Sequence, residues 1–309
     1  MLEIVARQRI WREIIEVLKV LAEDAWLRFH KWGIEVQVVD ATHWAMSRIE
    51  IDAAAFEYYN CEGDMGLGFE LMKFLDVIGL TEEDSLVKVS YPVYNSKNFG
   101  FGFSPRMYIQ FDTINRAIYP LEKSMMLEPT VPDVILHSSV KISTDKFSRA
   151  LRAAKQVADP VTISLNAQSF GVNVSGDTDT VNLSFDAEEL QDLVCDKPAK
   201  SQYSLSLLYP MIKRIESIAD TVTLSFNENH PLRLEFDFAD QAIRCVYFLA
   251  PRIEDIAGSD DAVFFEGTST NEHGQRQWMN GDGVWWCQDP NGSLKRYEAD
   301  DQIWVTESN

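Results

Sequence analysis

The chain has 309 residues, of which 46% are hydrophobic and 25% charged, so it carries enough apolar side chains for a buried core. This length predicts two compact domains and an appendage. The net charge of −20 excludes binding of nucleic acid by the surface as a whole, so contact with phosphates would require a local basic face. Four widely spaced cysteines argue against zinc sites and a disulfide scaffold, and we expect a soluble intracellular protein.

The first half of the sequence predicts two helices, each followed by strands. Apolar residues recur at helical spacing from Ile10 to Leu21, which indicates an amphipathic helix with a mostly basic outer stripe. Alternating runs over residues 26–29, 34–39 and 44–51 predict an antiparallel meander. A second helix is expected over residues 69–79, followed by strands over residues 86–91, 99–103 and 107–111.

The second half repeats this order, with helices expected over residues 145–158 and 205–218 and three strands after each. The segment LRFHKWGIEVQVVD lines up with ISLNAQSFGVNVSGD, which places Gly33 opposite Gly171. Period-two strands bury one face that helices must cover, so we predict a tandem duplication of α+β units with antiparallel sheets and helices on one side. The expected divisions are residues 1–118, a proline-bearing connector over 119–133, a second domain over 134–256, and an extension over 257–309.

Cations recur on the outer stripes of the predicted helices. Arg149, Arg152 and Lys155 share one side of the third helix, and Lys213 and Arg214 lie on the fourth. A solvated helix face is the ordinary explanation of any single stripe. Because the stripes recur on helices that all cover the same side of the sheets, we predict one continuous basic surface for phosphates.

Two segments are similar to a known family. VVDATHWAMSRIEI and VTLSFNENHPLRLEFDFADQAIRCVYFLAPRIED resemble the sliding clamps of the proliferating cell nuclear antigen type, found in eukaryotes, archaea and some viruses. The resemblance covers residues 1–255 and implies a ring of three identical subunits, threaded by duplex DNA and lined by helices. It implies a non-enzymatic processivity factor of DNA polymerase, acting in the cytoplasm or nucleoid of an archaeon or in the host cell of a virus. A paralogous subunit of a heterotrimeric clamp and an acidic hydrolase are the alternatives.

The resemblance also implies which side chains face DNA. The matching cationic positions are Arg12, Lys19, Lys73, Arg149, Arg152, Lys155, Lys213 and Arg214. Glu13, Asp76 and Leu208 stand where relatives often have Lys or Arg, so we expect a bore that is less positive than usual.

A pocket for short peptide motifs is implied as well, serving DNA polymerase, clamp loader, flap endonuclease and DNA ligase. Its matching residues are Val39, His43, Trp44, Met46, Leu127, Pro231, Phe248, Leu249, Ala250 and Pro251. Because unpaired strand edges invite pairing, we expect the ring to close through strands 107–111 and 180–185. The side chains expected at that contact are Met107, Ile109, Phe111, Val181, Leu183 and Phe185.

No catalytic chemistry is expected. His43 is disfavoured as a base because no Ser or Cys nucleophile motif and no H-E-x-x-H metal signature accompanies it. The sequence also has no G-x-x-x-x-G-K-[ST] phosphate loop. We therefore expect no catalytic residues, no metal and no cofactor.

The extension holds Trp278, Trp285, Trp286 and Trp304, half of the eight tryptophans of the chain. A hairpin over residues 284–298 and a strand over 302–306 are predicted. The pattern weakly resembles a short tryptophan-rich domain of bacterial proteins, from which no function transfers. The tryptophans form either the core of this small module or an exposed surface for a protein partner, with single-stranded DNA a less favoured ligand.

Overall fold

The computed structural model describes residues 1–92, 105–126, 129, 131 and 134–252, together with five short strands between residues 269 and 306. The expected strand over residues 99–103 lies outside these described residues. None of the helices in this part of the chain is long and apolar enough to span a membrane.

The described chain folds as two consecutive repeats of one order of elements. The first repeat contains β1 (Leu2–Arg7), α1 (Gln8–Lys19), β2 (Asp24–His30), β3 (Gly33–Val39), β4 (Ala45–Asp52), β5 (Tyr58–Cys61), β6 (Met65–Glu70), α2 (Leu71–Ile78), β7 (Leu86–Tyr91), β8 (Met107–Phe111) and β9 (Ile114–Ile118). The second contains β10 (Ser138–Ser143), α3 (Thr144–Ala154), β11 (Pro160–Leu165), β12 (Ser169–Ser175), β13 (Thr180–Asp186), β14 (Asp192–Cys195), β15 (Ala199–Ser204), α4 (Leu205–Glu216), β16 (Thr221–Phe226), β17 (Leu232–Phe238) and β18 (Ile243–Leu249). The predicted duplication is confirmed.

Short 3-10 helices mark the duplication in detail. Ala53–Ala55 follows β4 and Ala187–Glu189 follows β13, and an aspartate precedes each of them. Asp52 caps the first by accepting a hydrogen bond from Ala54 N at 2.8 Å. Asp186 and Glu189 form a capping box at the second.

The alignment of the two repeats differs from the sequence prediction by two residues. His30 pairs with Gly33 across the β2–β3 turn, and Asn166 donates its backbone N–H to Ser169 across the β11–β12 turn. Both turns therefore have two residues between the paired ends, and Gly33 matches Ser169 rather than Gly171. Gly33 is needed for its backbone, because its φ of 149° and the close approach of Ile51 O leave no space for a Cβ atom.

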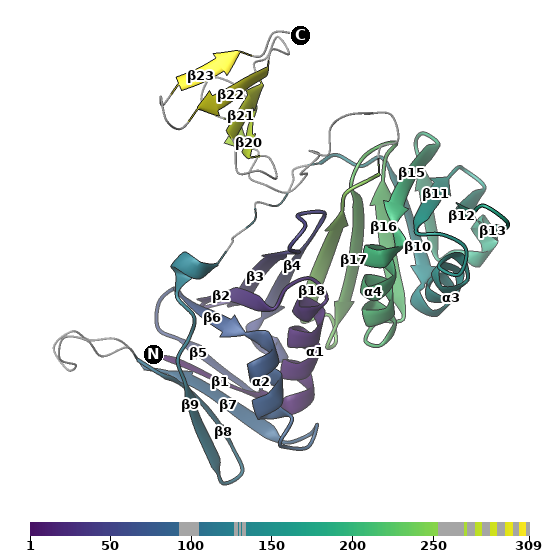
Figure 1. The fold of residues 1–309 in the computed structure, drawn as a ribbon. Coiled ribbons are helices and arrows are strands. Elements are labelled where there is room, and N and C mark those ends of the chain that lie inside the picture. Colours follow the sequence, from purple (N-terminus) through teal and green to yellow (C-terminus); the bar gives the residue numbers. More distant parts are fainter. Residues whose placement is uncertain are drawn as a thin grey trace.

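A nine-stranded sheet joins the two repeats, in the order β14-β10-β16-β17-β18-β4-β3-β2-β6. At its centre β18 pairs antiparallel with β4, from Ile243 opposite Ile51 to Leu249 opposite Ala45. The other sheets run β5-β1-β7-β8-β9 and β13-β12-β11-β15. Figure 1 shows the four helices together on one side of these sheets.

Each helix starts directly after a strand and buries one face. In α1 the buried side chains include Trp11, Ile14 and Leu18, which recur three or four residues apart and pack on the sheets. In α3 Phe147, Leu151 and Ala154 follow the same spacing. The helical periodicity of the sequence therefore predicted both the helices and their buried sides.

The predicted strand over residues 107–111 is confirmed as β8, but its expected position at the edge of a sheet was wrong. β8 lies between β7 and β9, and Met107, Ile109 and Phe111 are core residues with at most 3% of their surface exposed. The edges of this sheet are β5 and β9, and β9 is the edge next to β8. The sequence analysis missed β9 because its residues show no alternation of apolar and polar side chains. The second predicted edge is correct, since β13 ends its sheet.

The extension contains a separate antiparallel sheet. Its strands are β19 (Ser269–Thr270), β20 (Arg276–Met279), β21 (Trp285–Gln288), β22 (Leu294–Glu298) and β23 (Ile303–Thr306), paired in sequence order. The predicted hairpin corresponds to β21 and β22, and the predicted last strand to β23. β19 and β20 were not predicted.

Candidate DNA-facing and peptide-binding surfaces

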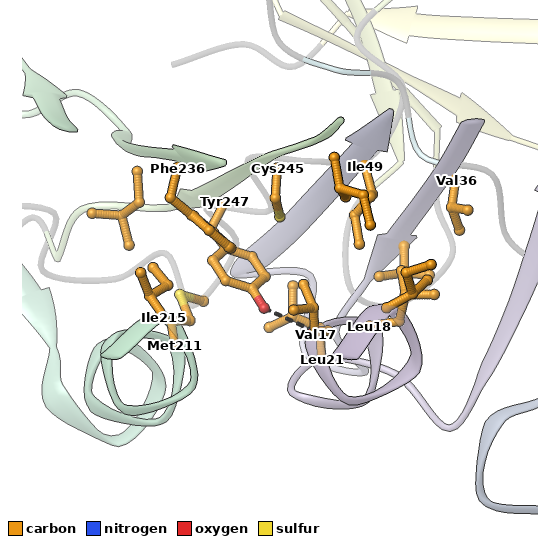
Figure 2. Packing of buried hydrophobic residues seen from close by; sticks show 14 of the residues in the cluster. Val17, Leu18, Leu21, Val36, Ile49, Met211, Ile215, Phe236, Cys245 and Tyr247 are labelled. Atoms are coloured by element: carbon orange, nitrogen blue, oxygen red, sulfur yellow. Dashed lines mark hydrogen bonds between the residues drawn. The ribbon is translucent and has the colours of Figure 1, made fainter. Parts of the chain in front are cut away.

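The four helices form one row across both repeats, in the order α2, α1, α4 and α3 (Figure 1). Figure 2 shows how the two central helices are held where the repeats meet. Tyr247 of β18 is fully buried there and donates its hydroxyl to the carbonyl oxygen of Val17 in α1 at 2.8 Å. The row is therefore continuous across the boundary between the repeats.

Seven of the eight cations expected to face DNA lie on the solvent side of this row. Arg149 pairs with Asp145 at 2.9 Å and Lys73 with Glu70 at 3.1 Å, while Arg12 pairs with Glu83. The ammonium of Lys155 lies 5.0 Å from the centroid of the Tyr209 ring. Such exposed pairs contribute about 0 to 1 kcal/mol, so a phosphate can replace them at little cost.

Three of these cations have neither an ion-pair partner nor an aromatic ring contact among the described residues. They are Lys19 at the end of α1, Arg152 in α3 and Lys213 in α4, and all three are exposed. They are the side chains most directly available to a polyanion.

Arg214 does not belong to this surface, which corrects the expectation from the sequence. Its side chain is 15% exposed, pairs with Glu16 of α1, and donates to the carbonyl oxygen of Glu13 at 3.3 Å. Arg214 therefore joins α4 to α1. Leu208 of α4 is fully buried, so it does not occupy a position on the solvent side of the helix row.

The charge of the row is concentrated on the second repeat. The solvent side of α3 carries Lys146, Arg149, Arg152 and Lys155 against Asp145. On α1 and α2, Arg9, Arg12, Lys19 and Lys73 are nearly balanced by Glu13, Glu16 and Asp76. Burial raises the pKa of Glu13, although nearby arginines partly oppose the shift.

The second candidate surface lies on the opposite side of the central sheet, where β4 begins and β18 ends. Met46, Phe248 and Ala250 are buried and form a small apolar cluster that is separate from the main core. Val39 and Trp44 pack against it, as do Val131 of the connector, Val134 directly after the connector, and Val246 of β18. The sequence analysis missed these three valines.

Strand alternation separates the remaining pocket candidates. Leu249 points to the opposite side from Phe248 and belongs to the main core, so its assignment to the pocket was wrong. Pro231 and Pro251 are buried, and His43 is partly exposed. Leu127 lies outside the described residues.

Asp40 holds the loop that presents Trp44. Its carboxylate accepts hydrogen bonds from Ala45 N at 2.6 Å and Thr42 N at 2.9 Å, and also from the Thr42 hydroxyl. His43 takes a left-handed conformation, with φ of 59°, at the tip of this turn. Ala250 N donates to Trp44 O at 2.8 Å, which ties the end of β18 to the same loop. The spacing of Asp40 and Thr42 in the sequence is typical of an aspartate that accepts a hydrogen bond from the backbone two residues later.

The described residues contain no group of three or more His, Cys, Asp or Glu side chains placed to hold a metal ion. The site is thus defined by a cationic row of helices and an apolar cluster at the outer junction of two repeats.

This duplicated architecture is that of the ring-forming DNA clamps. Models of the proliferating cell nuclear antigen N-terminal and C-terminal domains match residues 1–101 and 130–252. The chain belongs to the proliferating cell nuclear antigen family.

Curated relatives agree with this assignment, and a solved structure shares the fold. The DNA polymerase sliding clamp of Natronomonas pharaonis is 30% identical over 243 residues, which cover 78% of this chain and 94% of the relative. The one from Methanosarcina barkeri is 28% identical over 79% of this chain and 95% of the relative. A structure described as the C-terminal region of FEN-1 bound to A. fulgidus PCNA matches with a TM-score of 0.73 and 22% identity, over 82% of this chain and 99% of that one.

Proposed function

We propose that this chain is a DNA polymerase processivity factor that forms a homotrimeric ring around duplex DNA. The observation that carries the proposal is the combination of a continuous helix row bearing cations with two unpaired sheet edges, β9 and β13, at opposite ends of a duplicated chain. It is proposed to act without catalysis, metal or cofactor, in the cytoplasm or nucleoid.

The contact between the repeats supplies a template for the contact between subunits. β18 and β4 pair within the chain, while their counterparts in the other repeat, β9 and β13, are edges. Pairing of β9 with β13 of a second copy would repeat the internal contact. Three copies then contribute six equivalent repeats, and the last free edge meets the first.

Internal symmetry fixes the counterpart of each strand residue. Ile118 matches Leu249, since each is the last residue of its strand and pairs with the first residue of the preceding strand. An isolated β-bridge occurs three residues after each of them and supports the match. Leu121 pairs with Gly68 in the first repeat, and Arg252 pairs with Gln202 in the second. Likewise Asp186 matches Asp52.

Transfer of the β18–β4 register to the subunit contact gives its residue pairs. Cys245 is opposite Ile49 within the chain. Their counterparts place Ile114 opposite Leu183 of the next copy. Ile114 is 38% exposed in the single chain, so pairing would bury an apolar side chain against another. Val181, Leu183 and Phe185 stay candidates for this contact, whereas Met107, Ile109 and Phe111 do not.

Sequence-independent contact with phosphates would let such a ring slide. The cations of α3 supply most of the net positive charge of the helix row. The rest of the chain is negatively charged and would repel nucleic acid elsewhere. The apolar cluster at Met46 and Phe248 is the proposed docking place for peptides of polymerase, clamp loader, flap endonuclease and ligase. A role for the extension is not assigned.

Sedimentation equilibrium of the purified chain tests the assembly. The expected mass is about three times the 35.3 kDa of one chain. A stable monomer would contradict the homotrimer, and would favour the alternative of a paralogous subunit that needs two different partners.

Disulfide cross-linking tests the register. Ile114→Cys with Leu183→Cys should form covalent trimers on oxidation. The matching internal residues, Cys245 and Ile49, are a pair that exchanges no backbone hydrogen bonds. Side chains are closest at such pairs, which suits a disulfide. Asn115→Cys with Leu183→Cys is the control, since the two side chains would lie on opposite faces. Oxidation of the unsubstituted chain controls for its own cysteines.

A further inference from the structure

We propose that charge selects and orients the neighbouring subunit, with Arg106 and Arg116 forming a basic edge that receives the acidic turn over residues 176–179 of the next copy. The inference rests on the proposed ring. It adds the side chains that decide which edges pair.

The basic edge lies at β9. Arg106 directly precedes β8, and its guanidinium carbon lies 4.8 Å from the centroid of the Tyr119 ring. Tyr119 directly follows β9 and is 58% exposed. Packing on this ring holds the Arg106 cation beside the open edge. Arg106 and Arg116 are both exposed, and neither makes an ion pair within the described part of the chain.

The acidic edge lies at β13. Residues 156–196 include eight Asp or Glu and no Lys, Arg or His. Asp177 and Asp179 are exposed in the turn that leads into β13, which is closed by a 2.9 Å hydrogen bond from Gly176 N to Asp179 O. In a monomer the carboxylates of Asp177 and Asp179 repel one another, and residues 156–196 contain no cation that could offset this repulsion.

The internal symmetry brings the two edges together at this point. Ala250 N donates to Trp44 O within the chain. The matching residues are Tyr119 and Thr178, so Tyr119 N would donate to Thr178 O of the next copy. Asp177 and Asp179 flank Thr178 on either side. Arg106, whose side chain lies across the Tyr119 ring, therefore meets the acidic turn.

This pattern disfavours the other ways of pairing free edges. Two copies joined through β13 would place acidic turns together, and two joined through β9 would bring their Arg116 side chains near one another. Pairing of β9 with β13 relieves both repulsions, and this head-to-tail contact is the one that closes a ring.

Charge reversal tests the inference. Arg106→Asp should weaken trimer association about tenfold, because it removes one attraction and introduces a repulsion. Asp177→Arg alone should weaken it similarly. The double variant, Arg106→Asp with Asp177→Arg, should recover most of the loss. Lys31→Asp, an exposed lysine in the β2–β3 turn, changes the net charge equally and should leave association unchanged.

The outcomes separate this inference from the ring itself. If the unsubstituted chain is not a trimer, the proposed assembly fails. If it is a trimer and Arg106→Asp behaves like Lys31→Asp, the ring stands and charge matching is wrong. A double variant as weak as the two single ones would overturn the assigned pairing of Arg106 with the acidic turn.

Discussion

The hydroxyl of Tyr247 reaches 2.8 Å from the carbonyl oxygen of Val17 and so links the last strand of the second repeat to the first helix of the first (Figure 2). Val17 lies in the last turn of α1, where carbonyl groups lack partners within the helix. The bond therefore satisfies an otherwise unpaired buried acceptor and fixes α1 against the central sheet.

Removal of this hydroxyl should weaken the junction. We expect Tyr247→Phe to lower the free energy of unfolding by about 1 to 3 kcal/mol, because the carbonyl of Val17 stays buried without its donor. Urea denaturation followed by circular dichroism measures the change. Tyr108→Phe, at an exposed tyrosine, is the control. Equal stability of Tyr247→Phe and the unsubstituted chain would contradict the assigned role.

Stability should also fall in alkaline solution. Burial raises the pKa of Tyr247 well above its ordinary value of 10.0, so the folded protein keeps this proton where the unfolded chain loses it. The contribution is therefore complete below pH 10 and is lost as the pH rises toward the folded pKa. The pH dependence of the unfolding free energy should be shallower in Tyr247→Phe. An identical slope would show that Tyr247 does not titrate this way.

The charge distribution of the helix row predicts unequal roles for the repeats in DNA contact. Arg149→Glu with Arg152→Glu should reduce polymerase stimulation and its salt tolerance without dissociating the ring, since α3 carries the main positive charge. Lys19→Glu with Lys73→Glu, the matched change on α1 and α2, should have the smaller effect. Equal effects of the two double variants would contradict the asymmetry. If neither variant changed polymerase stimulation, the assignment of this surface to DNA contact would be wrong.

The peptide surface can be separated from the core beside it. Trp44→Ala should weaken binding of a polymerase-derived peptide by about 2 kcal/mol, the usual cost of losing a central aromatic contact. Leu249→Ala should lower stability by about 2 to 5 kcal/mol, because Leu249 is in the core, but should not change peptide affinity. Calorimetry on the folded variants distinguishes them. The reverse result would place the pocket on the wrong side of β18.

The repeat, the helices and most buried faces followed from the sequence because they depend on local periodicity. β9 did not, since its sequence, INRAI, does not alternate apolar with polar side chains, and nearly all of its residues are exposed in the single chain. Arg214 and Arg152 both occupy the outer stripes of helices, and only the packing of α4 against α1 distinguishes them. Leu249 differs from these cases. It is adjacent to Phe248 in β18, so strand alternation alone places the two side chains on opposite faces of the sheet.

The central claim is that the assembled ring encloses DNA, and topology tests it most directly. Subunits carrying Ile114→Cys and Leu183→Cys would be assembled with nicked circular DNA and then oxidised, so that each ring becomes covalent. We predict that these rings stay on the circle in high salt and are released when the circle is cut once. Release from the intact circle, or retention on linear DNA of equal length, would contradict a sliding ring.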